Sequence, residues 1–187
     1  MLFRSLEADS IQTRLLGLLR YLARQRPDEG WNQFVDADNG IAWNKISIGG
    51  HSQGAGHAAY IGKTRRVFRV GMYSGPSEWV NAANEPPNWF KLSSATPPGA
   101  FFGFIHDPDP IANPLSNATR VVDAWGNRSL FAMTGAIVDV NLVPASYAGS
   151  QRLVTLACTG SAFTALSRHN CPMLRGNEAT WDAVSYP

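Results

Sequence analysis

The chain has 187 residues, of which 44% are hydrophobic and 16% are charged, and its formal net charge is +2. These values are typical of one globular domain with a substantial core, here 1–187. The small charge, with no basic cluster larger than Arg65-Arg66 and nearby Arg69, argues against a nucleic-acid partner. No apolar run reaches transmembrane length, so we expect no membrane span.

The first predicted element is an amphipathic helix from about Ser5 to Gln25. Leucines recur there at helical spacing, and Pro27 follows the predicted end. Charged residues interrupt these leucines, so the N-terminus does not read as a signal peptide. The next stretch, as far as Asn44, is rich in turn-forming residues and predicts no long element.

The following segment predicts a strand, a tight turn and a helix around one serine. Ile46 and Ile48 predict the strand, Gly50-His51-Ser52-Gln53-Gly54 the turn, and 55–63 the helix. A serine at the tip of such a turn has a strained backbone, which requires small residues two positions away on either side. The two glycines meet this need. The pattern therefore favours a nucleophilic Ser52 over an ordinary turn serine.

Further strands are predicted downstream of the serine. They cover Val67–Tyr73, Phe101–Ile105, 136–140 and Arg152–Leu156. A long loop from Ser77 to Gly99 separates the first two, and its aromatic part, Trp79 to Phe90, could line a substrate pocket or simply pack the loop. Residues 115–125 are compatible with a helix. Strands that alternate with helices or loops predict an α/β fold with a mostly parallel sheet flanked by helices.

Chemically active side chains follow three of these strands. Ser52 follows the first, Asp107 and Asp109 follow the third, and His169 lies in a predicted loop after the last. The carboxyl ends of parallel strands meet at one edge of the sheet. A serine hydroxyl needs an imidazole base, and that imidazole needs a carboxylate to orient it. The order serine, aspartate, histidine therefore suggests a catalytic triad, against the alternative of a surface histidine.

These segments resemble the α/β-hydrolase family of serine esterases and lipases. The similarity extends over most of the chain from Ile11, and its motifs are Gly50–Gly54, Phe104–Pro110 and Arg168-His169-Asn170. The resemblance implies an ester hydrolase of small-molecule or lipid-like esters that works through an acyl-enzyme.

The resemblance also implies roles for particular residues. Ser52 would be the nucleophile, His169 the base and Asp109 the acid, with Asp107 as the alternative acid. More distant candidates for the acid are Asp123 and Asp139. The backbone N–H of Gln53 would be one oxyanion donor.

The other histidines are assigned supporting positions. His51 is expected to pack beside the turn, His57 to be structural within the following helix, and His106 to support the acidic pair.

The chain departs from the family pattern upstream of the serine. In the family, the second oxyanion donor normally comes from a loop that follows an earlier strand. No such strand precedes Leu2, and the sequence contains no His-Gly-Gly segment. We therefore expect the chain to hold the C-terminal portion of the family fold. This departure favours the alternative of a non-catalytic binding or structural module, or an inactive fragment. Acyl transfer or lyase chemistry is a further alternative.

Two cysteines, Cys158 and Cys171, are too few for a zinc site, so we expect no metal and no cofactor. They are compatible with a disulfide or with two buried thiols. Some secreted hydrolases of the family carry a disulfide near the catalytic histidine, so the resemblance favours the bridge. The expected disulfide, together with glycosylation sequons at Asn117 and Asn127, suggests a secreted or periplasmic protein. The sequence makes no prediction of oligomeric state.

Overall fold

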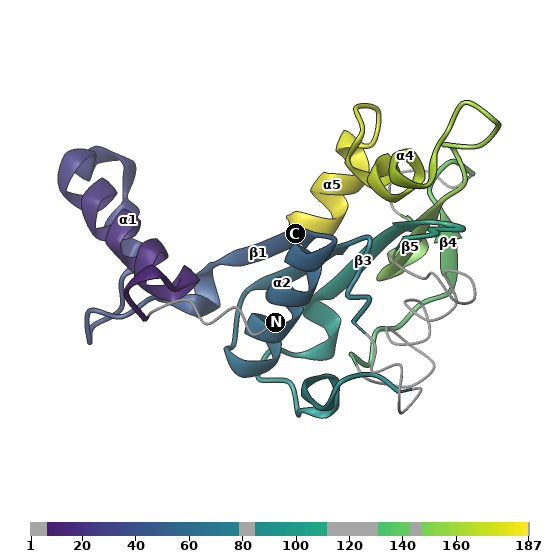
Figure 1. The fold of residues 1–187 in the computed structure, drawn as a ribbon. Helices are drawn as coiled ribbons and strands as arrows, with labels where there is room; N and C mark the ends of the chain where they lie inside the picture. The colour runs from purple at the N-terminus through teal and green to yellow at the C-terminus, as the bar shows by residue number, and fades with distance from the viewer. Residues whose placement is uncertain (1–6, 79–84, 112–130, 143–146, 187) are drawn as a thin grey trace. The chain divides into compact units, whose positions relative to one another are not determined.

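The computed structural model of the chain describes residues 7–78, 85–111, 131–142 and 147–186 (Figure 1). Contacts between residues divide the chain into two compact units, Met1–Ile46 and Ser47–Pro187. A single domain over the whole chain stays a prediction. The predicted helix at 115–125, both glycosylation sequons, Asp123 and Trp79 lie outside the described residues.

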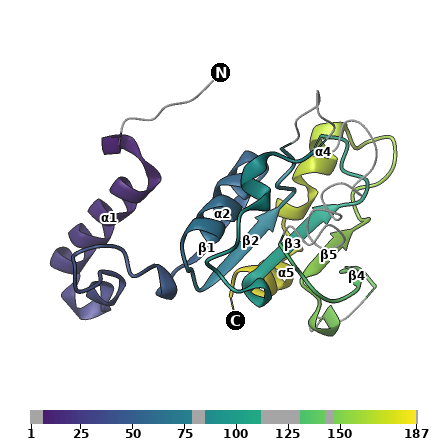
Figure 2. The same ribbon diagram turned by 90° about the horizontal axis from the view of Figure 1, so that it is seen from below.

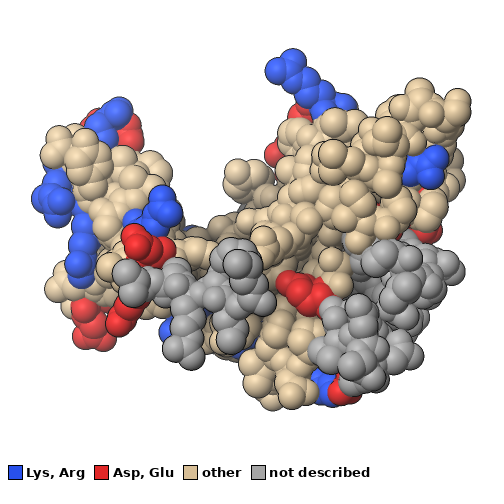
Figure 3. All heavy atoms as spheres, in the orientation of Figure 1, with Lys and Arg blue, Asp and Glu red and all other residues tan. Residues whose placement is uncertain are grey.

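The first unit is built on helix α1 (Ile11–Gln25). The side chain of Ser10 accepts a hydrogen bond from the backbone N–H of Thr13 at 3.1 Å, so Ser10 caps the helix and sets its start later than predicted. The end at Gln25 is as predicted. Short 3-10 turns follow in the turn-rich stretch, at Pro27–Glu29, Trp31–Phe34 and Trp43–Lys45. Basic and acidic side chains are interspersed on the visible face of this unit (Figure 3).

The second unit contains one sheet of five parallel strands in the order β1-β2-β3-β5-β4. The strands are β1 (Ser47–His51), β2 (Arg69–Tyr73), β3 (Phe101–His106), β4 (Ile137–Asp139) and β5 (Arg152–Thr155). The last four match predicted strands to within two residues at either end, whereas β1 extends to His51, which was predicted to lie in the turn. The α/β class with a parallel sheet is therefore confirmed.

Helices lie on both faces of this sheet (Figure 2). Alternate residues of a strand point to opposite faces. On β2, a Cβ added at Gly71 would lie 3.1 Å from Val184 of α5 (Glu178–Ser185). Val70, the preceding residue, lies against Gly62 of α2 (Gln53–Thr64) on the other face. The sheet is thus the middle layer between α2 and α5.

The core on the α5 side is an apolar cluster centred on the middle strands. It consists of Tyr73, Phe104, Val138, Tyr147, Leu153 and Val184. Burial of aliphatic and aromatic side chains of this size stabilises a fold by about 1.5–3 kcal/mol each. The cluster therefore holds β2, β3, β4 and β5 in fixed positions, and their carboxyl ends with them.

The prediction that His169 lies in a loop is wrong. The residue belongs to a short helix, α4 (Ala165–Asn170), and is 3% exposed. The side chain of Thr164 caps this helix by accepting a hydrogen bond from the N–H of Ser167 at 3.1 Å. Pro172 lies in the first turn of a 3-10 helix, Cys171–Met173, that continues from α4, a position that proline tolerates.

The long loop predicted from Ser77 to Gly99 contains short 3-10 turns at Asn88–Lys91 and Pro98–Ala100. Among the residues that the structure describes, no helix is both long and apolar enough to cross a membrane.

Candidate active site

Ser52 lies at the tip of the turn between β1 and α2. Its backbone has φ 58° and ψ −121°, a region that residues other than glycine rarely adopt. The Ser52 N–H donates to the carbonyl of Tyr73 at 2.9 Å, and the Ser52 carbonyl accepts from the N–H of Ala55 at 2.9 Å. The turn is therefore tied to β2 on one side and to α2 on the other, and these ties hold a conformation that costs about 1–3 kcal/mol.

Asp109 and His169 form a buried pair, although 60 positions separate them. Nδ1 of His169 lies 3.0 and 2.8 Å from the two carboxylate oxygens of Asp109. Asp109 is 1% exposed, and its Oδ1 also accepts from the N–H of Ile111 at 3.0 Å. A carboxylate accepts rather than donates, so Nδ1 carries the proton. In the neutral ring, Nε2 is then the basic nitrogen.

The backbone of His169 is held by the ends of two strands. Its carbonyl oxygen accepts from the hydroxyl of Ser74 at 2.8 Å and lies 3.1 Å from Nε2 of His51. The rings of His51 and His169 are 4.8 Å apart. His51 directly precedes Ser52, and Ser74 directly follows the residue that accepts the Ser52 N–H. These contacts place α4 against the same sheet edge as Ser52.

No hydrogen bond joins the Ser52 hydroxyl to the His169 ring. Nε2 of His169 is buried and has no hydrogen-bond partner in the part of the chain that the structure describes. The nitrogen that would accept the serine proton is therefore not occupied by another described group. In ligand-free enzymes, catalytic hydrogen bonds are often long and tighten only with substrate.

The alternative acids lie in other environments. Asp107 is partly exposed, and its N–H donates to the carbonyl of Thr155 at 2.9 Å. Asp139 accepts from the N–H and the side-chain amide of Asn141, at 3.0 and 2.7 Å, and so stabilises the turn after β4. Of the described candidates, Asp109 is the one bonded to His169.

The remaining predicted residues lie as follows. Gln53 is the first residue of α2, so its N–H has no acceptor within the helix. His57 is exposed on α2. His106 is fully buried at the end of β3, and its Nδ1–H donates to the carbonyl of Pro108 at 2.9 Å. That bond holds the loop that leads to Asp109.

The sequence did not indicate the position of Glu78, which lies against α2 at Gly56, four positions after Ser52. Its side chain packs against the first turns of α2, where a Cβ added at Gly56 would lie 1.8 Å from its Oε1. Burial raises the pKa of Glu78, and backbone hydrogen bonds and His57 oppose this effect. No spacing in the sequence points to this contact.

A cavity of about 450 Å³ adjoins His51, between β1 and α5. Tyr73, Met173 and Trp181 contribute to its wall. The Tyr73 hydroxyl lies 2.7 Å from the hydroxyl of Ser185, and burial raises the pKa of Tyr73. Among the described residues, no group of three or more potential metal ligands occurs.

A disulfide joins Cys158 to Cys171, with the Cα atoms 6.0 Å apart. The predicted bridge is confirmed, and the alternative of two free thiols is wrong. Cys171 directly follows α4 and is 1% exposed. The bridge therefore links the segment after β5 to the end of the helix that carries His169.

Removing this bridge with the Cys158→Ala/Cys171→Ala variant should lower the free energy of unfolding by about 3 kcal/mol, because the unfolded chain gains the freedom of the open loop. Urea unfolding followed by circular dichroism should show a midpoint lower by about 1–2 M, and the slope should rise slightly because the unfolded chain without the bridge exposes more surface. A midpoint equal to that of the native chain would show that α4 is held without the bridge.

Comparisons of the chain with protein-family models, with curated proteins and with solved structures found no match in any of the three. The class of the chain is therefore given by its own fold, which is an α/β fold with a parallel sheet. At the carboxyl edge of that sheet, a strained serine and a buried aspartate–histidine pair are brought together.

Proposed function

We propose that this protein is a serine hydrolase of the α/β-hydrolase type that cleaves a carboxylic ester. The observation that carries the proposal is the buried pair of Asp109 and His169 at the sheet edge where the strained Ser52 lies. A buried carboxylate beside an imidazole costs solvation unless the pair is well bonded. Catalysis would give this costly burial a role, because His169 would act as the base and Asp109 would orient its ring.

In the proposed reaction, Nε2 of His169 takes the Ser52 proton as the serine oxygen attacks the ester carbonyl. Asp109 keeps the proton on Nδ1 and stabilises the imidazolium that forms. The imidazolium then donates its proton to the leaving alcohol, which leaves an acyl-enzyme on Ser52. Water, deprotonated by the same nitrogen, releases the acid and restores the serine.

The start of α2 supports one part of the oxyanion site. The Gln53 N–H is the first of the helix, and the positive end of the helix dipole lies there. A single oxyanion donor is worth about 10²–10³ in rate. We assign this role to Gln53 and assign no second donor.

The cavity beside His51 adjoins the candidate site, although Ser52 and His169 do not line it, and could hold part of a small-molecule or lipid-like ester. Its volume of about 450 Å³ is in the range of small-ligand sites, and Met173 and Trp181 supply apolar wall. The disulfide between Cys158 and Cys171 is compatible with an extracellular location.

The second candidate function is a non-catalytic binding module built on the same fold. Among the described residues, Nε2 of His169 has no hydrogen-bond partner and so does not bond to Ser52. This observation favours the binding module. The two candidates differ in the reactivity of Ser52.

A fluorophosphonate probe distinguishes these two candidates, because it phosphonylates serines that an adjacent base has activated. Peptide mass spectrometry of the folded full chain should find the label on Ser52, and the Ser52→Ala variant should lose it. A folded chain whose Ser52 stays unlabelled, beside a serine hydrolase labelled in the same mixture, would refute the hydrolase and favour the binding module.

A further inference from the structure

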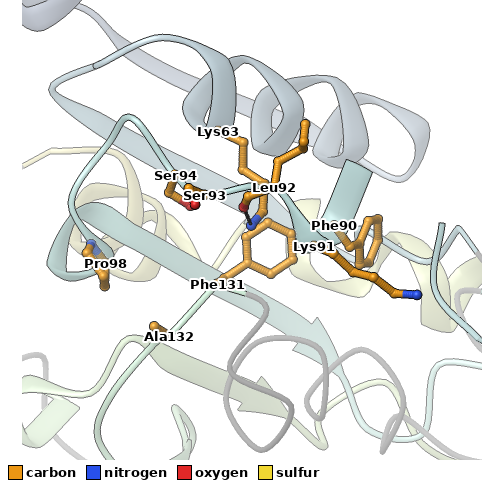
Figure 4. Close-up of a pocket in the computed structure, with 9 residues that line it drawn as sticks. All are labelled: Lys63, Phe90, Lys91, Leu92, Ser93, Ser94, Pro98, Phe131 and Ala132. Carbon is orange, nitrogen blue, oxygen red and sulfur yellow. Dashed lines mark hydrogen bonds between the residues drawn. The ribbon is translucent and has the colours of Figure 1, made fainter. Parts of the chain in front are cut away.

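The far end of α2 borders a cavity of about 470 Å³ whose wall groups are engaged with one another (Figure 4). Lys63 is 4% exposed, and its Nζ donates to the carbonyl of Leu92 at 2.7 Å and lies 4.9 Å from the centre of the Phe131 ring. Phe90, from the aromatic loop that was predicted to line a substrate pocket or to pack, is 1% exposed here. The lysine and the rings therefore serve the packing of the protein itself.

Another cavity, of about 370 Å³, lies in the first unit between α1 and the turns that follow this helix. Two arginines, two asparagines and two small apolar residues line it, namely Arg20, Ala23, Arg24, Asn32, Val35 and Asn39. Its volume is in the range of sites for small ligands. The wall thus offers cations and amide donors, and no acidic residue belongs to it.

The two arginines of this cavity are held close together. Arg20 and Arg24 are four positions apart on α1, so their side chains lie on one face of the helix, a spacing at which like charges repel. Arg20 donates to the carbonyl of Asn39, which fixes its guanidinium beside the cavity and leaves most of its donors unused. In the described ranges, no ion pair or hydrogen bond joins Arg24 to another residue. An anion between the two guanidinium groups would relieve their repulsion.

Other charges near the cavity do not cancel this attraction. Asp36 turns its carboxylate into its own turn, where Oδ1 accepts from the N–H groups of Asp38 and Gly40 at 3.0 and 2.6 Å. The negative end of the α1 dipole lies near Arg24, but it amounts to about half an elementary charge. The two guanidinium groups carry one full positive charge each. An anion in the cavity is therefore favoured.

We propose that this cavity binds the phosphate group of a phosphate monoester. Such a group carries about two negative charges at pH 7, which matches the two guanidinium groups. Each planar guanidinium fork can donate to two phosphate oxygens, and the side-chain amides of Asn32 and Asn39 supply further donors. The side chains of Ala23 and Val35 contact the organic part. A soluble monoester and a lipid headgroup present this same group, and the test separates them.

The test titrates the folded full chain with glycerol phosphate at pH 7 and measures the heat of binding by isothermal titration calorimetry. We expect saturable binding of one molecule per chain. The Arg24→Gln variant should bind about tenfold more weakly or worse, because it loses charge-assisted hydrogen bonds. Arg24 is exposed, so this variant should fold, and circular dichroism checks that it does.

The matched control is Arg14→Gln, which removes the same charge from an exposed position of the same helix outside the cavity wall. Arg14 lies ten positions before Arg24, roughly 15 Å along the helix. At an ionic strength of about 0.1 M the Debye length is about 10 Å, so we expect an affinity within about twofold of the native chain. An equal loss in the two variants would overturn the proposal, because only the charge of the helix would then matter.

Two further probes define the ligand. Acetate should bind at least about tenfold more weakly than glycerol phosphate, because it carries half the charge, and an equal affinity would overturn the assignment to phosphate. Phosphatidylcholine vesicles that contain phosphatidic acid test the lipid source. Cosedimentation that requires Arg24, without binding of glycerol phosphate, would assign the phosphate to a lipid headgroup. If neither probe shows binding that depends on Arg24, the proposal is overturned. The Ser52→Ala variant should bind like the native chain, so the result is independent of the proposed hydrolase.

Discussion

Replacing Asp109 with asparagine is expected to slow the fluorophosphonate labelling of Ser52 by about 10⁴-fold at neutral pH. Asparagine keeps the size of the side chain, but its amide can donate to Nδ1 and so favours the tautomer with the proton on Nε2. That tautomer cannot accept the serine proton. The rate constant for labelling, measured by stopping the reaction at timed intervals, gives the size of the loss.

The matched control is Asp107→Asn, two positions away. Asp107 is partly exposed and bonds through its backbone to Thr155, so its side chain should matter less than threefold. Both variants should show the circular dichroism spectrum of the native chain. A large loss in Asp107→Asn with an unchanged rate in Asp109→Asn would transfer the role of the acid to Asp107. Unchanged rates in both would leave the buried pair a structural one.

Local features of the fold could be predicted from the sequence because short-range physics determines them. The apolar runs at Val67–Tyr73 and Phe101–Ile105 predict buried strands, and both are present as β2 and β3. The glycines around Ser52 predict a strained turn, and the φ of 58° shows it. The start of α1 was predicted too early, because leucine periodicity does not weigh the capping bond that Ser10 makes.

The environment of the candidate base could not be predicted in the same way. The contacts to the His169 carbonyl come from residues 118 and 95 positions away, His51 and Ser74. Such contacts depend on which strands become neighbours, and no local pattern encodes that. The burial of Lys63 is similar, because its partners Leu92 and Phe131 belong to distant loops. The order of serine, aspartate and histidine predicts candidate residues for a site, but not their geometry.

The two glycines of the turn should respond very differently to alanine. A Cβ added at Gly50 would lie 2.1 Å from the carbonyl oxygen of Gly54 and 2.9 Å from the backbone nitrogen of Ala55. Both contacts are to backbone, so no side chain can move aside. A Cβ added at Gly54 would meet no neighbouring group within 4 Å outside its own helix. The sequence motif treats these positions alike, whereas the structure requires glycine only at Gly50.

Gly50→Ala is therefore expected to lower the free energy of unfolding by about 4 kcal/mol or more, since α2 must shift away from β1. Gly54→Ala should raise it by up to about 1 kcal/mol, because alanine favours a helix more than glycine does. Urea unfolding of the two variants beside the native chain measures both changes. Equal effects of the two substitutions would contradict the close approach of α2 to β1. Because the same approach holds Ser52 at its positive φ, Gly50→Ala protein that still folds should label more slowly with fluorophosphonate than Gly54→Ala.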